Sequence, residues 1–303
     1  MKLIVEPDAG IVPIVAAIKS AKKSIDVLIF RLDRDEVTRA LEAAVGRGVA
    51  VRALIAHTNS GGSKTLRKLE LRLLESGVIV SRTADDLVRY HGKMCIVDGR
   101  ILHVYGFNFT GLDIEKSRSF GVVTRNARLV QEGMKLFEAD VARHPYSPGS
   151  DRFVVSPENA RERLSAFIKG ARKQLLIYDP KVNDLAMLRL LSERQKAGVE
   201  VKIIGKLCGK KSELTAEKCP TKRLHVRAII RDGRRAFVGS QSMRKLELEK
   251  RREIGVMVHD ETVVKQMQKI FEGDWALTDS GKKEAKKAEK AEKKDGKEDQ
   301  PAA

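Results

Sequence analysis

Two stretches of the sequence decide the fold, HGKMCIVD (91–98) and HVRAIIRD (225–232). Each reads as a histidine, any residue, a cation, four further residues and an aspartate, set on an apolar framework. Side chains alternate along a strand, so each histidine should point the same way as the cation two residues on. Two such strands face to face would place a nucleophile, an acid and two positive charges around one phosphate.

The two motifs belong to a repeat that extends over most of the chain. Around the motifs, residues match at an offset of 134: Gly121 with Gly255, and Asp140 with Asp274. Nearer the N-terminus the offset is 150, as in the match of GV at 48–49 with GV at 198–199. A register held through each block indicates an internal duplication. We therefore expect a first half over 1–145 and a second over 146–279, meeting at the Pro/Gly-rich stretch HPYSPGSD (144–151).

Within each copy, apolar runs alternate with helical periodicity. SIDVLIF (24–30) and VAVRALIA (49–56) read as strands, and residues 36–48 between them read as a helix closed by glycine, which is a parallel βαβ unit. The motif strands, joined by Asp-Gly-Arg, predict a hairpin in each copy. Helices near 127–142 and 261–275 close the halves. Residues 280–303, rich in Lys, Glu and Ala, predict a disordered tail or a fraying helix.

The composition favours anionic partners. The 303 residues carry 59 Lys and Arg against 41 Asp and Glu, a net charge of +18 that attracts phosphate esters, nucleic acid or acidic lipid. The three cysteines have neither paired nor metal-like spacing, which fits a reducing compartment. We find no signal peptide and no run long enough to span a membrane, and therefore expect a cytoplasmic protein, with peripheral membrane contact left open.

The repeated residues can perform phosphodiester chemistry. A neutral imidazole attacks phosphorus, and the opposing imidazolium protonates the leaving oxygen. Lys93 and Arg227 would hold the phosphoryl oxygens. Further donors follow each motif, namely Asn108 in the first copy and Ser240 and Ser242 in the second. Asp98 and Asp232 precede glycine in tight turns, so we expect them to be structural.

At residues 1–277 the sequence resembles the phospholipase D superfamily, whose mark is a duplicated HxKxxxxD motif followed by a Gly–small–x–Asn segment. The resemblance implies an α/β fold of two halves related by a pseudo-twofold axis, each a mixed, mainly parallel sheet flanked by helices. It implies no metal or other cofactor, and a composite site that needs no second copy of the chain. It also implies a covalent phosphohistidine on His91, with His225 as general acid and base.

The two copies differ in ways that bear on these roles. Arg227 stands where the family has lysine, and guanidinium is planar and bulkier than ammonium. The family often has an acid about 21 residues after the motif aspartate; here that position holds Glu253 in one copy and Ser119 in the other. If the pairing crosses between halves, Glu253 supports His91 and leaves His225 without a carboxylate.

Three functions remain open on the sequence. The first is hydrolysis or transfer of a phospholipid headgroup, and the second is a metal-independent nuclease that uses the basic clusters. Aromatic residues are only 5% of the chain, which gives poor support to base stacking. The third is a catalytically impaired protein that binds anions or nucleic acid. The sequence does not decide whether water or an alcohol is the final acceptor.

Overall fold

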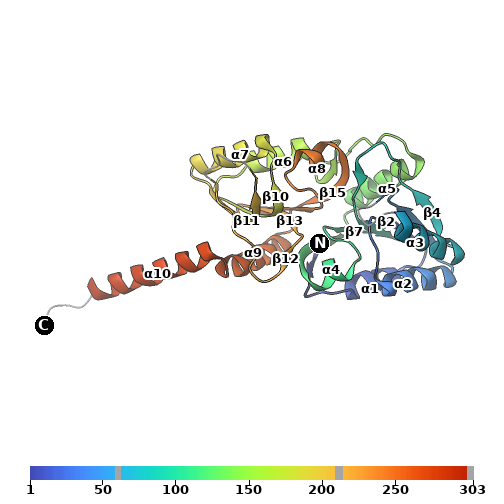
Figure 1. The fold of residues 1–303 in the computed structure, drawn as a ribbon, viewed down its shortest axis with the longest axis horizontal. Helices are drawn as coiled ribbons and strands as arrows, with labels where there is room; N and C mark the ends of the chain where they lie inside the picture. The colour runs from blue at the N-terminus through green and yellow to red at the C-terminus, as the bar shows by residue number, and fades with distance from the viewer. Residues whose placement is uncertain (59–62, 209–213, 299–303) are drawn as a thin grey trace.

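The computed structural model describes residues 1–58, 63–208 and 214–298, which form two α/β halves lying side by side (Figure 1). The strands of the first half are β1 (Lys2–Glu6), β2 (Ser24–Ile29), β3 (Ala50–Ile55), β4 (Ile79–Arg82), β5 (Arg89–Tyr90), β6 (Met94–Val97), β7 (Ile101–Tyr105) and β8 (Ser117–Thr124). Its helices are α1 (Val12–Ser20), α2 (Asp35–Gly46), α3 (Ser63–Glu75), α4 (Gly111–Glu115) and α5 (Ala127–Ala142).

The second half repeats this order, but among its described residues it has no counterpart of α3 or β4. Its strands are β9 (Phe153–Ser156), β10 (Gln174–Val182), β11 (Glu200–Leu207), β12 (Arg223–Leu224), β13 (Arg227–Arg231), β14 (Arg235–Gly239) and β15 (Arg251–Val258). Its helices are α6 (Ala160–Lys169), α7 (Leu185–Lys196), α8 (Lys245–Glu249) and α9 (Glu261–Ala276), followed by α10 (Asp279–Glu298). The expected hairpins are confirmed as β6–β7 and β13–β14, and the expected closing helices as α5 and α9.

Each sheet is mixed, but the prediction that it is mainly parallel is wrong. The first sheet has the order β1-β8-β7-β6-β2-β3-β4, in which β2, β3 and β4 run parallel and the other neighbours antiparallel. The second has the order β11-β10-β13-β14-β15, parallel at β10–β11 and antiparallel beyond it. The βαβ units do give parallel pairs, but the motif hairpins at the centre of each sheet force antiparallel pairing.

The halves exchange short strands. The first-half strand β5 pairs in parallel with β15 of the second half, and the second-half strand β12 pairs in parallel with β8 of the first. A shared apolar core lies between the sheets, with Phe120 and Val122 from β8 packed in one cluster with Ile254 and Val256 from β15. The two repeated His-x-cation motifs follow directly on the exchanged strands, so the exchange positions both histidines.

Two buried ion pairs also cross between the halves. On β8, Arg118 donates to Asp274 of α9, with Nε–Oδ2 at 2.8 Å and Nη2–Oδ1 at 3.1 Å. At the pseudo-twofold counterpart, Arg252 of β15 donates from Nε to Asp140 Oδ1 of α5 at 3.1 Å. All four residues are at most 5% exposed. Each long central strand is thus tied to the closing helix of the other half.

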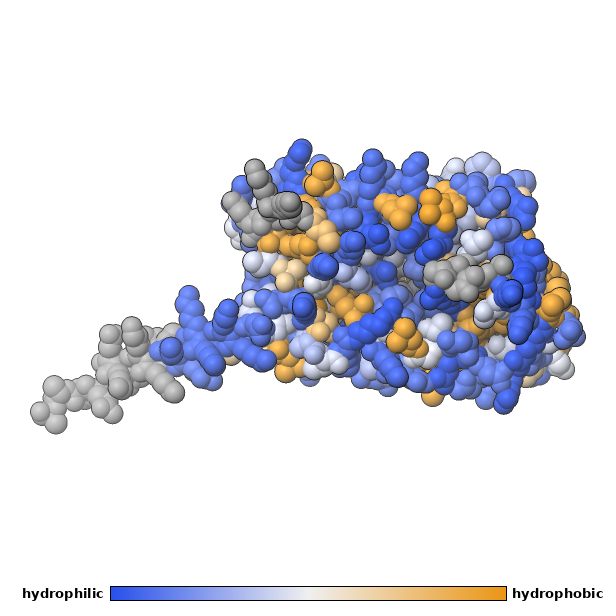
Figure 2. All heavy atoms as spheres, viewed as in Figure 1, coloured by the Kyte–Doolittle hydropathy of each residue, from blue (hydrophilic) through white to orange (hydrophobic). Residues whose placement is uncertain are grey.

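The C-terminal segment forms helix α10 through Glu298, which is the helical one of the two alternatives expected for 280–303; residues 299–303 lie outside the described residues. Ala, Glu and Lys are strong helix formers, so the composition permits a helix. Its first turns also dock, since Glu284 pairs with Lys202 and accepts from Trp275 Nε1. A side chain at Gly281 would collide with the Trp275 carbonyl, so glycine allows this close approach. Farther out, the helix is hydrophilic and projects from the molecule (Figures 1 and 2).

Candidate active site

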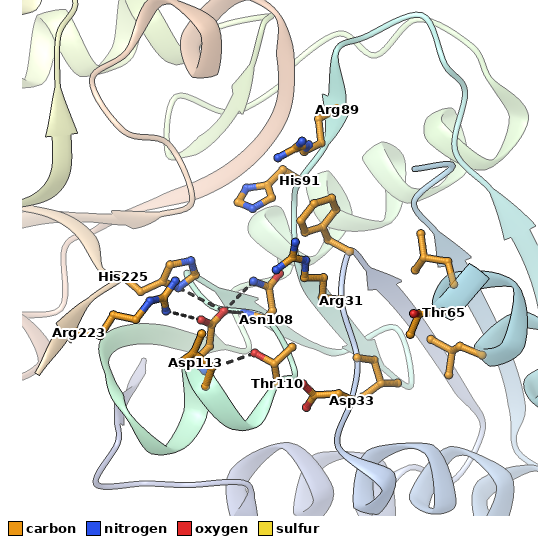
Figure 3. Close-up of a pocket in the computed structure, with 15 residues that line it drawn as sticks. Arg31, Asp33, Thr65, Arg89, His91, Asn108, Thr110, Asp113, Arg223 and His225 are labelled. Carbon is orange, nitrogen blue, oxygen red and sulfur yellow. Dashed lines mark hydrogen bonds and ion pairs between the residues drawn. The ribbon is translucent and has the colours of Figure 1, made fainter. Parts of the chain in front are cut away.

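Each motif histidine is held by the backbone of the other half. His91 N donates to the carbonyl of Arg252 at 2.7 Å, continuing the β5–β15 pairing. Likewise, His225 N donates to the carbonyl of Arg118 at 3.1 Å, continuing the β12–β8 pairing. Both histidines are therefore placed by the strand exchange, and both face one cavity (Figure 3).

The cavity has a volume of about 330 Å³ and lies mainly against the first half. It is lined by Phe30, Arg31, Leu32, Asp33, Thr65, Leu66, Leu69, Arg89, His91, Asn108, Thr110, Leu112, Asp113, Arg223 and His225. Helix α3, which has no counterpart among the described residues of the second half, supplies Thr65, Leu66 and Leu69. The duplicated fold thus carries a pocket that is not itself symmetric.

His91 contacts both a carboxylate and an ammonium group. Its Nδ1 lies 2.8 Å from Glu253 Oε2, across the boundary between the halves as expected. Lys93 Nζ lies 3.0 Å from Nδ1 and 2.9 Å from Nε2 of the same ring. Glu253 is fully buried and Lys93 nearly so. A carboxylate at Nδ1 fixes the tautomer with the proton on Nδ1 and leaves the Nε2 lone pair for attack on phosphorus.

His225 also has a carboxylate nearby, and the expectation that it would have none is wrong. Asp113 Oδ2 on α4 lies 3.4 Å from His225 Nδ1, and the same oxygen accepts from Asn108 Nδ2 at 2.6 Å. The contact is longer than a hydrogen bond, so the carboxylates support the two histidines unequally. A sequence signal existed, because Glu247 stands 134 residues after Asp113. The two acids are bound alike, since Ser242 N donates to Glu247 Oε2 at 2.7 Å and Asn108 N donates to Asp113 Oδ2 at 3.0 Å.

Burial and nearby cations keep both histidines neutral. The pKa of His91 falls well below 6.5, first through burial and then through Lys93 and Arg227. The pKa of His225 falls well below 6.5 through burial, then through the same two cations. Burial raises the pKa of Glu253, partly offset by Lys93. Neutral imidazole is the nucleophilic form, so the free site is set for attack on an anion.

The two motif cations lie behind the histidines and differ in their contacts. Lys93 Nζ lies within hydrogen-bonding distance of the His91 ring nitrogens and 5.4 Å from the Phe30 ring centre, and burial lowers its pKa from 10.5 to about 7. Arg227 instead donates from Nη1 to the carbonyl of His225 at 2.7 Å and from Nε to Ser242 Oγ at 3.3 Å. The guanidinium is therefore held by its own half, whereas the ammonium is free to follow a bound anion.

Of the three expected phosphate donors, one lines the cavity and two are bonded to other protein groups. Asn108 lines the cavity, and its Oδ1 has no hydrogen-bond partner among the described residues. Ser242 contacts Arg227 as above. Ser240 Oγ donates to the Ile254 carbonyl at 3.3 Å and accepts from Ile254 N at 3.1 Å. The Ser240 hydroxyl is thus occupied by β15, which leaves Asn108 as the expected donor that lines the cavity.

The motif aspartates cap the start of a neighbouring strand. Asp98, at φ +55°, accepts from the backbone N–H groups of Lys22, Lys23 and Ser24 at 2.7–3.1 Å. Asp232, at φ +54°, does the same for residues 172–174. Neither aspartate lines the cavity. These contacts are those of a structural residue, in line with the turn position read from the sequence.

Within residues 1–58, 63–208 and 214–298, no group of three or more His, Cys, Asp or Glu side chains is arranged to hold a metal ion. No helix in that part of the chain combines the length and apolarity needed to cross a bilayer.

Comparisons with known proteins point in one direction. A family model described as "Cardiolipin synthase, PLD-like domain" matches residues 14–141 and 164–275. "Mitochondrial cardiolipin hydrolase" of Danio rerio is 30% identical over 125 residues, which is 40% of this chain and 53% of that protein. "Minor cardiolipin synthase ClsB" of Bacillus subtilis (strain 168) is 24% identical over 310 residues, covering 85% of this chain and 76% of that protein.

Solved structures share the fold. Polyphosphate kinase from Porphyromonas gingivalis superposes with a TM-score of 0.74 at 21% identity, covering 90% of this chain and 50% of that one. Phosphatidylserine synthase from Haemophilus influenzae Rd KW20 gives a TM-score of 0.69 at 12% identity, covering 91% and 86%. The chain thus spans about half the length of the zebrafish relative and of the kinase. With the family model matched once in each half, the chain belongs to the phospholipase D-like family.

Proposed function

We propose that the chain is a phospholipase D-like enzyme that hydrolyses or transfers phosphodiesters, with phospholipid headgroups as substrate. The observation that carries the proposal is the shared cavity: both motif histidines line it, and each has a carboxylate from the other half at its Nδ1. The names of the relatives, cardiolipin synthases and a cardiolipin hydrolase, favour a lipid substrate. The enzyme works as a monomer in the cytoplasm, in peripheral contact with a membrane.

In the first step, His91 Nε2 attacks phosphorus and the bond from phosphorus to the leaving alcohol oxygen breaks. His225 gives that oxygen a proton, which yields a phosphohistidine and a free alcohol. Glu253, at 2.8 Å from Nδ1, stabilises the positive charge that develops on the His91 ring. Lys93 shifts from the ring nitrogens to the non-bridging oxygens, where its ammonium opposes the growing negative charge.

In the second step, water or a second alcohol attacks the phosphohistidine. His225, now neutral, takes the proton of the attacking hydroxyl, and the bond from phosphorus to His91 Nε2 breaks. The acid role of His225 requires that substrate binding raise its pKa, which Lys93 and Arg227 lower in the free site. A phosphodiester anion between these cations offsets them and favours imidazolium.

The cavity walls favour a lipid over a nucleic acid. Four leucines line the pocket, namely Leu32, Leu66, Leu69 and Leu112. Phe30 is the sole aromatic residue other than histidine in the described lining, and its ring contacts His91 edge-on with centres 4.5 Å apart. Binders of single-stranded nucleic acid stack bases on several exposed aromatic rings, an arrangement that this wall lacks.

The pH dependence of kcat/KM should follow the protonation state of Lys93. Because its pKa is about 7, the ammonium is present below that value and lost above it, so kcat/KM should fall as the pH rises through about 7. The fall in kcat should occur at a higher pH than the fall in kcat/KM, since a bound anion favours the charged form of Lys93. The Lys93→Arg variant keeps its charge, so its pH profile should lose this limb even if its absolute rate is lower. An unchanged alkaline limb in Lys93→Arg would assign the titration to another group.

The experiment that tests the proposed function compares substrates side by side. Wild type and His91→Ala are given bis-p-nitrophenyl phosphate, phospholipid in mixed micelles, and plasmid DNA, each in EDTA. We expect wild type to turn over the model diester and the phospholipid, with loss of both activities in the variant. Turnover of DNA alone would establish the nuclease instead. Salt-sensitive binding without variant-sensitive turnover of any substrate would show an impaired binding protein.

A further inference from the structure

The two halves present their arginines to the cavity differently. Arg89 and Arg223 are counterparts, each two residues before a motif histidine. Arg223 Nη1 donates to Asp113 Oδ1 at 2.6 Å and to Ser117 Oγ at 2.8 Å, so its charge is compensated. In contrast, the Arg89 guanidinium forms no hydrogen bond or ion pair with any residue that the structure describes, although it is half-buried in the cavity wall.

The cause is one position on β15. The counterpart of Asp113 is Glu247, which Arg89 would need as its partner, and the counterpart of Ser117 is Arg251. Glu247 Oε1 instead accepts from Arg251 Nη1 at 3.2 Å and from Arg244 Nη1 at 3.0 Å. Arg251 thus occupies the Glu247 carboxylate that would otherwise be the partner of Arg89. Burial, then Arg251 and Arg31, lower the pKa of Arg89, as expected for a cation facing cations.

Arg31 adds a second uncompensated charge beside the first. It lies two residues after the end of β2, next to Phe30 in the chain, and its guanidinium carbon lies 5.7 Å from the Phe30 ring centre. The Arg89 guanidinium carbon lies 5.5 Å from the same centre. No ion pair to Arg31 occurs among the described residues; Asp33, two residues on, accepts from Gly111 N at 2.9 Å. Figure 3 shows both guanidinium groups beside His91, and Asp33 at the far end of the pocket.

Two half-buried guanidinium groups facing one cavity repel each other and have lost part of their hydration. An anion bound between them would offset both the mutual repulsion and the lost hydration. The scissile phosphate already has Lys93 and Arg227, which contact the two histidines and are not among the pocket-lining residues. Arg31 and Arg89 do line the pocket. Their charge therefore matches an anion in addition to the one undergoing reaction.

We propose that Arg31 and Arg89 form a second anion subsite, which binds a second phosphate of a lipid headgroup in which a short alcohol joins two phosphates. Guanidinium binds phosphate oxygens through paired donors, so two of them can hold one phosphate firmly. The four leucines of the wall fit the apolar part of such a lipid. The subsite rests on the proposed function, since it selects among substrates of the same catalytic centre.

The test compares two lipids that differ in the second phosphate. Wild type, Arg31→Gln and Arg89→Gln are assayed on cardiolipin and on phosphatidylglycerol, each diluted in detergent micelles. We expect wild type to prefer cardiolipin, and each variant to lose about 10-fold or more in kcat/KM on cardiolipin, as for other charge-assisted bonds. The loss on phosphatidylglycerol should be several-fold smaller. Lys181→Gln, which removes the exposed counterpart of Arg31 on β10, is the matched control and should retain wild-type kinetics on both.

Several outcomes would overturn the subsite. Equal losses on the two lipids would mean that the arginines serve the scissile phosphate, and no loss on either would mean that they bind no substrate. An arginine-dependent preference for a 5′-phosphorylated dinucleotide over the unphosphorylated one, without a preference between the lipids, would replace the lipid with a nucleotide. Failure of the proposed function is distinct, because wild type would then turn over no phosphodiester at all, including bis-p-nitrophenyl phosphate.

Discussion

We expect the His91→Asn variant to form no acid-labile phosphoenzyme and to lose about 10⁴-fold or more in kcat, because the nucleophile itself is gone. The amide keeps a similar size and a donor toward Glu253, so the fold should persist. Acid quench of a reaction with radiolabelled diester, followed by filter capture of the protein, measures the intermediate. The same sample gives kcat from multiple turnover.

The His225→Asn variant is the matched comparison. With bis-p-nitrophenyl phosphate the leaving group needs no proton, so this variant should still form the phosphoenzyme from His91. Its hydrolysis should slow by about 10²–10⁴-fold because the base that activates water is missing, and the intermediate should accumulate. A phosphoenzyme that persists in His91→Asn and vanishes in His225→Asn would reverse the two roles.

The Asp274→Ala variant should lose about 3–5 kcal/mol of unfolding free energy, since the buried Arg118 guanidinium loses its two bonds to that carboxylate. Among the described residues it keeps only longer contacts, to the Glu6 carbonyl at 3.2 Å and to the exposed Asp8 at 3.4 Å. Asp274 Oδ2 also accepts from Tyr178 OH at 2.6 Å, so a second buried donor loses its partner. Urea unfolding, followed by fluorescence and by circular dichroism, measures the change. Catalysis should fail at lower urea than in wild type.

Asp140→Ala is the control at the counterpart position and should be less damaging. Arg252 keeps contacts with Glu158 and the Ser156 carbonyl after the change, and Asp140 Oδ2 has no hydrogen-bond partner among the described residues to begin with. Burial also raises the pKa of Asp140 to about 7, so its charge is only partly present at neutral pH. Equal destabilisation by the two variants would show that both pairs carry the same share of the docking energy.

The sequence predicted the repeat, the hairpins and the helices because these depend on local periodicity and on glycine-marked turns. The family pattern also placed an acid at Glu253, which was expected to meet His91 if the pairing crossed between the halves, and it does cross. The sequence did not predict Asp113 beside His225, although Asp113 and Glu247 repeat at the same offset. Their partners depend on the strand exchange, which two-residue strands such as β5 do not reveal by any pattern.

The same limit explains the arginines. The repeats of Arg89 with Arg223, and of Asp140 with Asp274, are visible in the sequence, but what each side chain contacts depends on residues far away in the chain. One replacement, Arg251 at the position of Ser117, decides which arginine is compensated. Whether Arg89 has a partner depends on which other arginines reach the Glu247 carboxylate in the folded protein. Aligning the two copies position by position does not reveal that competition.

The exchange of β5 and β12 has a consequence for the chain during its synthesis. When residues 1–145 have left the ribosome, His91 and Lys93 are present, but the Arg252 carbonyl and the Glu253 carboxylate that hold the His91 imidazole are not yet made. A nascent first half therefore carries a histidine with neither orientation nor charge support. We therefore expect reactivity toward phosphate esters to begin only after residues 251–258 have been made and β15 has paired with β5, so that a first half alone does not cleave phosphodiesters.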